Sequence, residues 1–188
     1  VAPDSDRYAI KFKYDVYEQI GAPKFNKLEE VIPILKKMKE VYPKNAEGTT
    51  AWGMNLFADF DTAYFYNMQS ILPLIGYAPN YLQYGVEYDA AAGKGYSIFR
   101  DNSVYKRASK FMYEMNKAGL LDPDSLTQTR TTVNKKMDTA AAVAGWGAAP
   151  AWESKGYYPV SFGEFQPFLT YDNPYGQIGI GISKKAEN

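Results

Sequence analysis

Segments whose apolar residues recur at every second position alternate along this sequence with segments whose apolar residues recur at helical spacing. This alternation constrains the fold more than any other feature. Residues 8–14 place apolar side chains at every second position, which is typical of a strand with one buried face. Residues 103–118 place them at helical spacing instead, and that pattern ends at Gly119. Because the period keeps changing in this way, the sequence predicts an α/β fold with helices packed around a mixed sheet.

The predicted elements follow one another without an internal repeat or a second domain boundary, which indicates a single domain over residues 1–188. Strands are predicted at 8–14, 52–56, 86–89, 96–99, 140–145, 158–161 and 178–182, with 86–89 and 96–99 joined as a hairpin. Helices are predicted at 15–20, 28–42, 61–75, 103–118 and 148–155, with one more passing through Asn134 and Met137.

Three local features predict where helices begin. Asn26 and Glu29 have the spacing of a capping pair before the helix at 28–42. Pro33 lies inside that helix and requires either a kink or a later start. Asn102 or Ser103 can cap the helix that ends at Gly119.

Composition removes several classes of function. Lys plus Arg and Asp plus Glu number 21 each, so no summed positive field attracts nucleic acid or an anionic bilayer. The chain has no cysteine and no histidine, which removes the thiolate nucleophile, the disulfide and the commonest metal ligand and general base. Nucleic acid, cofactors and metals are therefore not expected as partners.

The ends of the chain indicate a piece of a longer protein. The sequence opens without Met, has no signal-peptide character and contains no apolar stretch of the roughly 20 residues that a membrane span needs. We therefore expect any export signal or lipid anchor to lie outside this chain.

The order of these segments resembles the second lobe of family 1 extracellular solute-binding proteins, the maltose-binding-protein-like group. Residues 14–23 look like the family's crossover strand and short helix, which end in Gly-x-Pro. The further segments that resemble the family in order are Trp52 with Gly53, the loop at 118–124, the small-residue strand and tryptophan turn at 140–152, and the returning strand at 178–188.

The resemblance implies both a fold and a function. The fold would be a periplasmic-binding-protein-like type II lobe of C-terminal type, with its partner lobe absent from the chain. The function would be that of the non-catalytic, ligand-capturing component of an ABC importer, which binds a sugar or oligosaccharide in an interlobe cleft. That cleft would close about hinges near 8–14 and 178–182 and deliver the ligand to ABC permease subunits. The aromatic hairpin region is similar to the Gram-positive lipoprotein branch, which implies an extracellular or periplasmic location.

The high aromatic content, 16% of residues, suits a sugar site, because a sugar offers a C–H face to flat rings and hydroxyls to polar groups. Trp146 is the first candidate, since Gly145 and Gly147 leave room beside its ring. In the resembling proteins the tryptophan turn at this place lines the cleft. A core tryptophan is the alternative interpretation.

The other candidate ligand-binding residues each have a structural alternative. Tyr66 is preferred over Tyr64, in a segment whose remaining apolar residues have core spacing. Asp61 either accepts hydrogen bonds from sugar hydroxyls or caps its helix. Trp52 is explained at least as well as a half-buried strand residue, and Trp152 equally well as a helix anchor.

Other functions stay open at this point. A non-catalytic carbohydrate-binding or adhesion module would be all-β, and a solute-binding protein for peptides would share the fold. A glycosidase needs a chosen pair of carboxylates, and nothing selects Asp59 with Asp61. Asp122 and Asp124 begin like a calcium loop, but Thr127 stands where that loop needs glycine.

Overall fold

The computed structural model describes residues 7–58, 77–78, 85–89, 92–147, 150–160, 163–164 and 168–169. The predicted helix at 61–75 and the predicted strand at 178–182 lie outside these residues. The described strands are β1 (Arg7–Lys13), β2 (Trp52–Met54), β3 (Tyr77–Ala78), β4 (Val86–Asp89), β5 (Lys94–Ser97), β6 (Ala142–Gly147), β7 (Tyr157–Pro159) and β8 (Phe168–Leu169). The described helices are α1 (Tyr14–Gln19), α2 (Val31–Val41), α4 (Val104–Lys117) and α5 (Arg130–Asp138), with short 3-10 helices η1 (Leu28–Glu30), η4 (Pro123–Leu126) and η5 (Pro150–Lys155).

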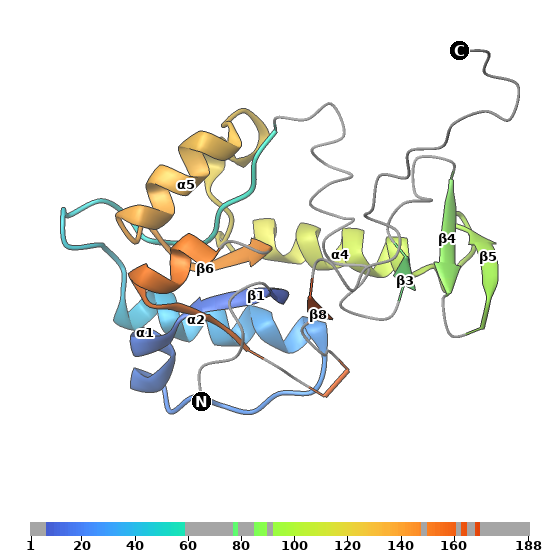
Figure 1. Ribbon diagram of the computed structural model, residues 1–188, viewed down its shortest axis with the longest axis horizontal. Coiled ribbons are helices and arrows are strands. Elements are labelled where there is room, and N and C mark those ends of the chain that lie inside the picture. The colour runs from blue at the N-terminus through green and yellow to red at the C-terminus, as the bar shows by residue number, and fades with distance from the viewer. Residues whose placement is uncertain are drawn as a thin grey trace, which may run out of the picture.

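The larger described sheet is mixed, as the alternation of periods predicts. Its strands have the order β2-β6-β1-β7, with β8 also paired to β1. β2 and β6 are parallel, whereas β1 is antiparallel to β6, β7 and β8. Figure 1 shows α5 on one side of these strands and α1 and α2 on the other. The α/β prediction is therefore confirmed, and an all-β module does not fit this fold.

Strand β1 is buried on both faces, so the prediction of a single buried face was wrong. Ile10 and Phe12 are fully buried, but so is Lys11 between them. The Lys11 Nζ lies 3.2 Å from Glu153 Oε1 of η5, a short helix that packs where the sequence pattern predicts solvent. A lysine can occupy such a position because its charge is paired, which alternation alone does not reveal.

The start of α2 resolves the two predictions made for it. No side chain caps the helix: the backbone N of Asn26 donates instead to Glu30 Oε2 at 3.0 Å, so the proposed pair with Glu29 was wrong. The 3-10 turn η1 delays the α-helix to Val31, which leaves Pro33 in its first turn. Proline needs no hydrogen-bond partner there, and no kink is required.

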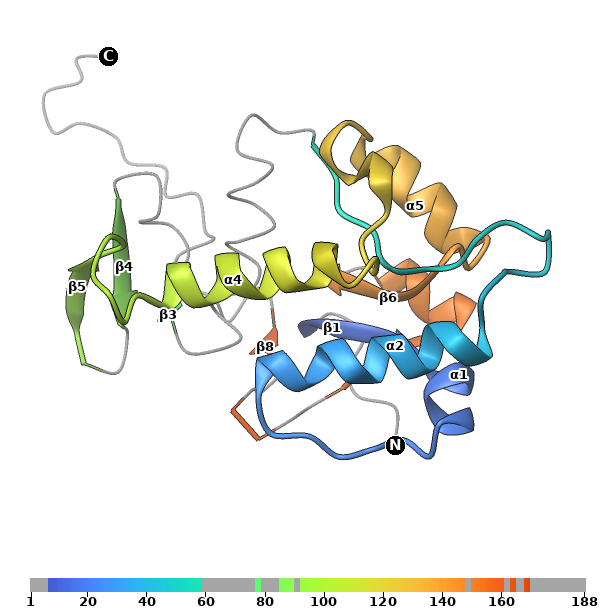
Figure 2. The ribbon, with the colours of Figure 1, turned by 180° about the vertical axis from the view of Figure 1, so that it is seen from behind.

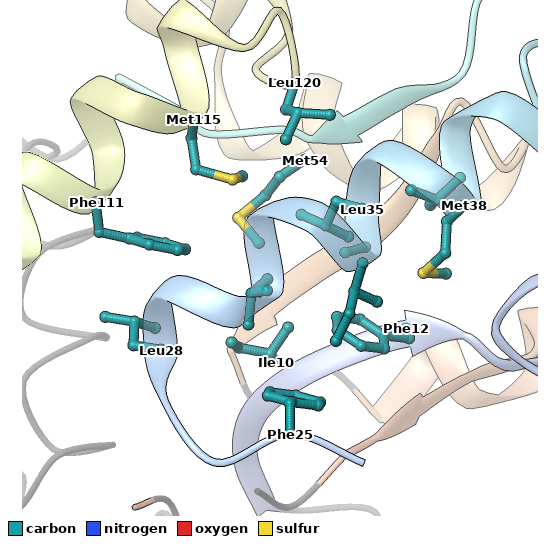
Figure 3. Close-up of a cluster of buried hydrophobic side chains, with 14 of the residues drawn as sticks. Ile10, Phe12, Phe25, Leu28, Leu35, Met38, Met54, Phe111, Met115 and Leu120 are labelled. Atoms are coloured by element: carbon teal, nitrogen blue, oxygen red, sulfur yellow. The ribbon is translucent and has the colours of Figure 1, made fainter. Parts of the chain in front are cut away.

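The main core lies between β1, β2, α2 and α4. Figure 3 shows side chains from η1 and α2 pointing toward side chains from the other elements: Leu28, Leu35 and Met38 from the former, and Ile10, Phe12, Met54, Phe111 and Met115 from the latter. Ser103 caps α4 by accepting a hydrogen bond from the Lys106 backbone N, which confirms one of the two predicted caps. Along the described parts of the chain, no helix is both long and apolar enough to span a membrane.

The predicted hairpin is present as β4 and β5, paired from Val86 with Ser97 to Asp89 with Lys94. The carboxylate of Glu87 connects this hairpin to α4 through hydrogen bonds. Glu87 is fully buried and accepts hydrogen bonds from Arg100 Nε at 2.8 Å, from Ser103 Oγ at 2.9 Å and from the Tyr105 backbone N at 2.9 Å. Glu87 therefore satisfies donors at the start of α4 and holds the hairpin against that helix.

Replacing Glu87 with glutamine is expected to lower the free energy of unfolding by about 2 kcal/mol, because charge-assisted hydrogen bonds become neutral ones and an amide N–H₂ faces Arg100. Urea denaturation followed by circular dichroism measures the change. Asp89→Asn, a half-buried carboxylate in the same strand, is the matched control. An equal loss in both variants would show that Glu87 has no special role in docking the hairpin.

Candidate ligand-binding edge of the sheet

The carboxyl ends of the parallel strands β2 and β6 form the candidate edge. Trp52 pairs with Ala142 and Met54 with Ala144, so the two strands begin side by side, and β6 continues to Gly147 beyond the end of β2 at Met54. In open α/β sheets, ligands bind outside the carboxyl ends of parallel strands. This edge is therefore where the sheet topology favours a binding cleft.

Trp146 lies at this edge. The sequence places it in a turn after the strand, but its backbone is still part of β6 and pairs with Ile10 of β1. Its side chain lies outside the described part of the structure. β1 extends β6 beyond the predicted end because the two strands pair over residues 144–147, a long-range pairing that local residue types do not specify. Its ligand-binding role stays a prediction.

A group of buried polar side chains holds the chain where it leaves β2. Ser125 Oγ accepts a hydrogen bond from the Leu56 backbone N at 3.3 Å, and Gln128 Nε2 donates to the Leu56 carbonyl at 2.6 Å. The Ala58 N donates to the Gln128 carbonyl at 2.8 Å. These contacts fix the chain at residues 56–58, and local sequence patterns do not reveal them because Ser and Gln in a turn are usually solvated.

Among the described residues of this neighbourhood, Asn55 leaves both polar atoms of its side chain unsatisfied, and Gln128 leaves its Oε1 unsatisfied. Asn55 is buried, and neither its Oδ1 nor its Nδ2 has a hydrogen-bond partner in the structure as described. A buried amide without partners costs about 1–3 kcal/mol. Asn55 follows Met54 directly, so its unsatisfied amide lies at the same carboxyl edge of the sheet as Trp146.

Trp52 lies at the opposite end of the same strands. Its partner in β6 is Ala142, four residues before Trp146, which corresponds to about 13 Å along a strand. The Lys39 Nζ lies 4.4 Å from the centre of the Trp52 ring and donates to the Gly119 carbonyl at 2.8 Å. Burial lowers the pKa of Lys39. Trp52 thus contacts a cation that bridges α2 and the end of α4, and it does not share an edge with Trp146.

Trp152 belongs to a second core cluster with Tyr157 and residues of α5. Its side chain is 6% exposed, and its ring meets that of Tyr157 edge to face at 6.5 Å between centroids. A Cβ on Gly145 would overlap the Trp152 ring and would approach Met137 Cε to 2.7 Å. The glycine beside Trp146 therefore makes room for Trp152, and the sequence-based argument that it leaves space for a ligand does not apply to it.

The phenol of Tyr157 fixes this cluster to the sheet. Its hydroxyl donates to the Ala142 carbonyl at 2.5 Å, and burial raises its pKa. Tyr64, Tyr66 and Asp61 lie outside the described residues, so the structure does not place them relative to this cluster or to Trp146.

The two aspartates that resemble a calcium loop have a lysine as their counter-ion. Asp122 caps η4 by accepting a hydrogen bond from the Asp124 N at 3.0 Å. Lys136 Nζ lies 2.5 Å from Asp122 Oδ2 and 3.0 Å from Asp124 Oδ2. Burial alone would lower the pKa of Lys136, but these two carboxylates raise it. Within the described ranges, no group of three or more acidic side chains could hold a metal ion.

The solved structures that are similar to this chain include two of the same protein. The chain is similar to the S. pneumoniae ABC-transporter substrate binding protein FusA in complex with kestose, with a TM-score of 0.57 and 16% identity over 89% of this chain and 34% of that one. It is also similar to the FusA EF-hand mutant in complex with fructo-nystose, with a TM-score of 0.56 and 17% identity over 87% of this chain and 33% of that one.

The sequence comparisons give no relative: no family model and no curated protein matches. The chain spans about a third of the length of the two structural neighbours. At this level of identity the likeness concerns the fold. The chain thus has the mixed α/β fold of part of an ABC-transporter substrate-binding protein.

Proposed function

We propose that this chain is one lobe of the ligand-capturing component of an ABC importer and that the ligand is a sugar or oligosaccharide. The observation that carries the proposal is the similarity of its fold to a substrate-binding protein in complex with kestose. The parallel pair β2 and β6 supports it, because the carboxyl edge of that pair carries Trp146. The protein is then a binding protein without catalytic activity.

The proposed mechanism is closure of a cleft between this lobe and a second one. β1 pairs with β6, β7 and β8, so bending at a hinge near residues 8–14 would carry the whole sheet with it. A ligand that touches both lobes favours the closed form because only that form offers both sets of contacts. Permease subunits would then recognise the closed form. We place the working protein outside the cytoplasmic membrane, as a lipoprotein or a periplasmic protein.

The chain alone is expected to bind sugar no more tightly than the millimolar range. One stacked ring removes about 100 Å² of apolar surface from water, which gives about 2.5 kcal/mol at about 25 cal/mol per Å². Two such rings do not reach the roughly 8 kcal/mol of micromolar binding, and association entropy opposes them. Isothermal titration of the chain with kestose measures this, and micromolar affinity would contradict the half-site proposal.

The function itself is tested on the longer protein that would contain both lobes. Calorimetric titration with a panel of oligosaccharides, and with peptides as the competing ligand class, is expected to show micromolar or tighter binding of a sugar. Binding of peptides alone would keep the importer proposal and overturn the substrate class. Turnover of chromogenic glycosides would overturn both.

A further inference from the structure

Helices α2 and α4 enclose a groove on the surface of the lobe. Figure 2 shows the two helices side by side and running in the same direction. At one end Arg107 Nε and Nη2 bind the two carboxylate oxygens of Glu29, both at 2.7 Å. At the other end Lys39 Nζ donates to the Gly119 carbonyl at 2.8 Å. Between these two tethers lies a hollow of about 460 Å³.

The tether at Arg107 is strong and has a net charge of −1, because one guanidinium binds the two carboxylates of Glu29 and Glu164. Arg107 also binds Glu164 Oε1 at 2.5 Å, and Glu164 accepts a hydrogen bond from the Leu28 N at 2.7 Å. The hydrogen bond from Arg107 holds the pKa of Glu29 below its usual value, and Glu29 with Glu164 raises that of Arg107. The charge of Arg107 is therefore used within the chain and is not available to a partner.

The floor and rim of the groove differ in character. The floor is apolar and consists of Ile32, Pro33, Phe111 and Ala118. The rim carries Lys36, Lys110 and Lys117 beside the acid Glu114, and Glu29 of the Arg107 tether also lines the groove. None of these three lysines has an ion pair among the described residues. Tyr113, which is 61% exposed, lies on α4 next to this rim in the helical wheel.

We propose that this groove is a docking site for an acidic amphipathic helix of a partner protein. The apolar floor calls for apolar side chains at helical spacing, and the three rim lysines, which have no ion pair in the described part of the chain, favour acidic residues beside them. The tethers are twelve residues apart, from Arg107 on α4 to Gly119 just after its end, which corresponds to about 18 Å or roughly three helical turns. Exposed Tyr113 adds an aromatic contact of the kind enriched at interfaces.

The test uses a synthetic helical peptide of about 14 residues, with leucines at i, i+3, i+4 and i+7 and glutamates on its other faces. Titrated into the isotope-labelled full chain, it is expected to shift the backbone resonances of α2 and α4 in a saturable way. The affinity should fall as salt rises, because surface charges are screened. The same peptide with lysines in place of glutamates is expected not to bind.

Two matched double variants decide the role of the rim. Lys36→Glu with Lys110→Glu is expected to weaken peptide binding at least about tenfold, since two favourable charge contacts are lost and the reversed charges repel the glutamates of the peptide. Lys37→Glu with Lys135→Glu makes the same change in net charge at exposed positions outside the groove and should leave the affinity within about twofold.

The proposal is overturned by three results: no resonance shift, equal binding of the lysine peptide, or equal affinity in the two double variants. It is also overturned if the α2 and α4 resonances shift with protein concentration alone, because the groove then binds a second copy of the chain. None of these readouts depends on sugar, so the groove can fail while the proposed importer function holds, and the reverse.

Discussion

Replacing Trp152 with alanine is expected to lower the free energy of unfolding by about 3–5 kcal/mol, the cost of removing a large aromatic side chain from a core. The ring fills the space left open by Gly145 and packs against Tyr157, so its loss leaves a cavity that neither neighbour can close. Urea denaturation of the chain, followed by circular dichroism, measures the change. Trp152→Phe keeps part of the contact and should lose clearly less.

This experiment separates the two interpretations of Trp152 that the sequence leaves open. A core residue stabilises the chain whether or not a ligand is present. A ligand platform contributes little to stability, since a ring kept free for a ligand makes few contacts in its absence. If Trp152→Ala lowers the free energy of unfolding by less than about 1 kcal/mol, the core assignment is contradicted and Trp152 returns to the candidate ligand residues.

The helices and strands were predictable because their signals are local. The change from period two to helical spacing gives β1, α2 and α4, and Ser103 and Gly119 mark the ends of α4. The predictions failed where a segment distant in the sequence packs against a residue and changes its burial. Lys11 is buried because η5 brings Glu153 over β1 from a position 142 residues further along the chain, and no local pattern carries that information.

The candidate site was less predictable, because it depends on strand register. The sequence presents Trp52 and Trp146 as equivalent tryptophans near the ends of strands. Their positions at opposite ends of the β2 and β6 pair follow only from the register that aligns Trp52 with Ala142. The burial of Asn55, Ser125 and Gln128 also depends on the docking of the turn at 122–128 against the chain that leaves β2.

Replacing Trp146 with alanine in the two-lobed protein is expected to weaken sugar binding by about 70-fold, which corresponds to the roughly 2.5 kcal/mol that one stacked ring contributes. The expectation rests on the proposed function and on the position of Trp146 at the carboxyl edge of β6. Isothermal titration with the best ligand of the oligosaccharide panel measures the change. The free energy of unfolding is measured in parallel, so that a loss of folding is not mistaken for a loss of binding.

Trp52→Ala is the matched control, because it removes the same side chain about 13 Å away at the other end of the parallel strands. It should leave sugar affinity within about twofold and lower stability instead, since the ring contacts Lys39 and loses a cation–π interaction of about 1 kcal/mol. If Trp52→Ala weakens binding and Trp146→Ala does not, the ligand lies at the amino edge of β2 and β6. The carboxyl-edge assignment would then be wrong, although the sugar-capture proposal would still hold.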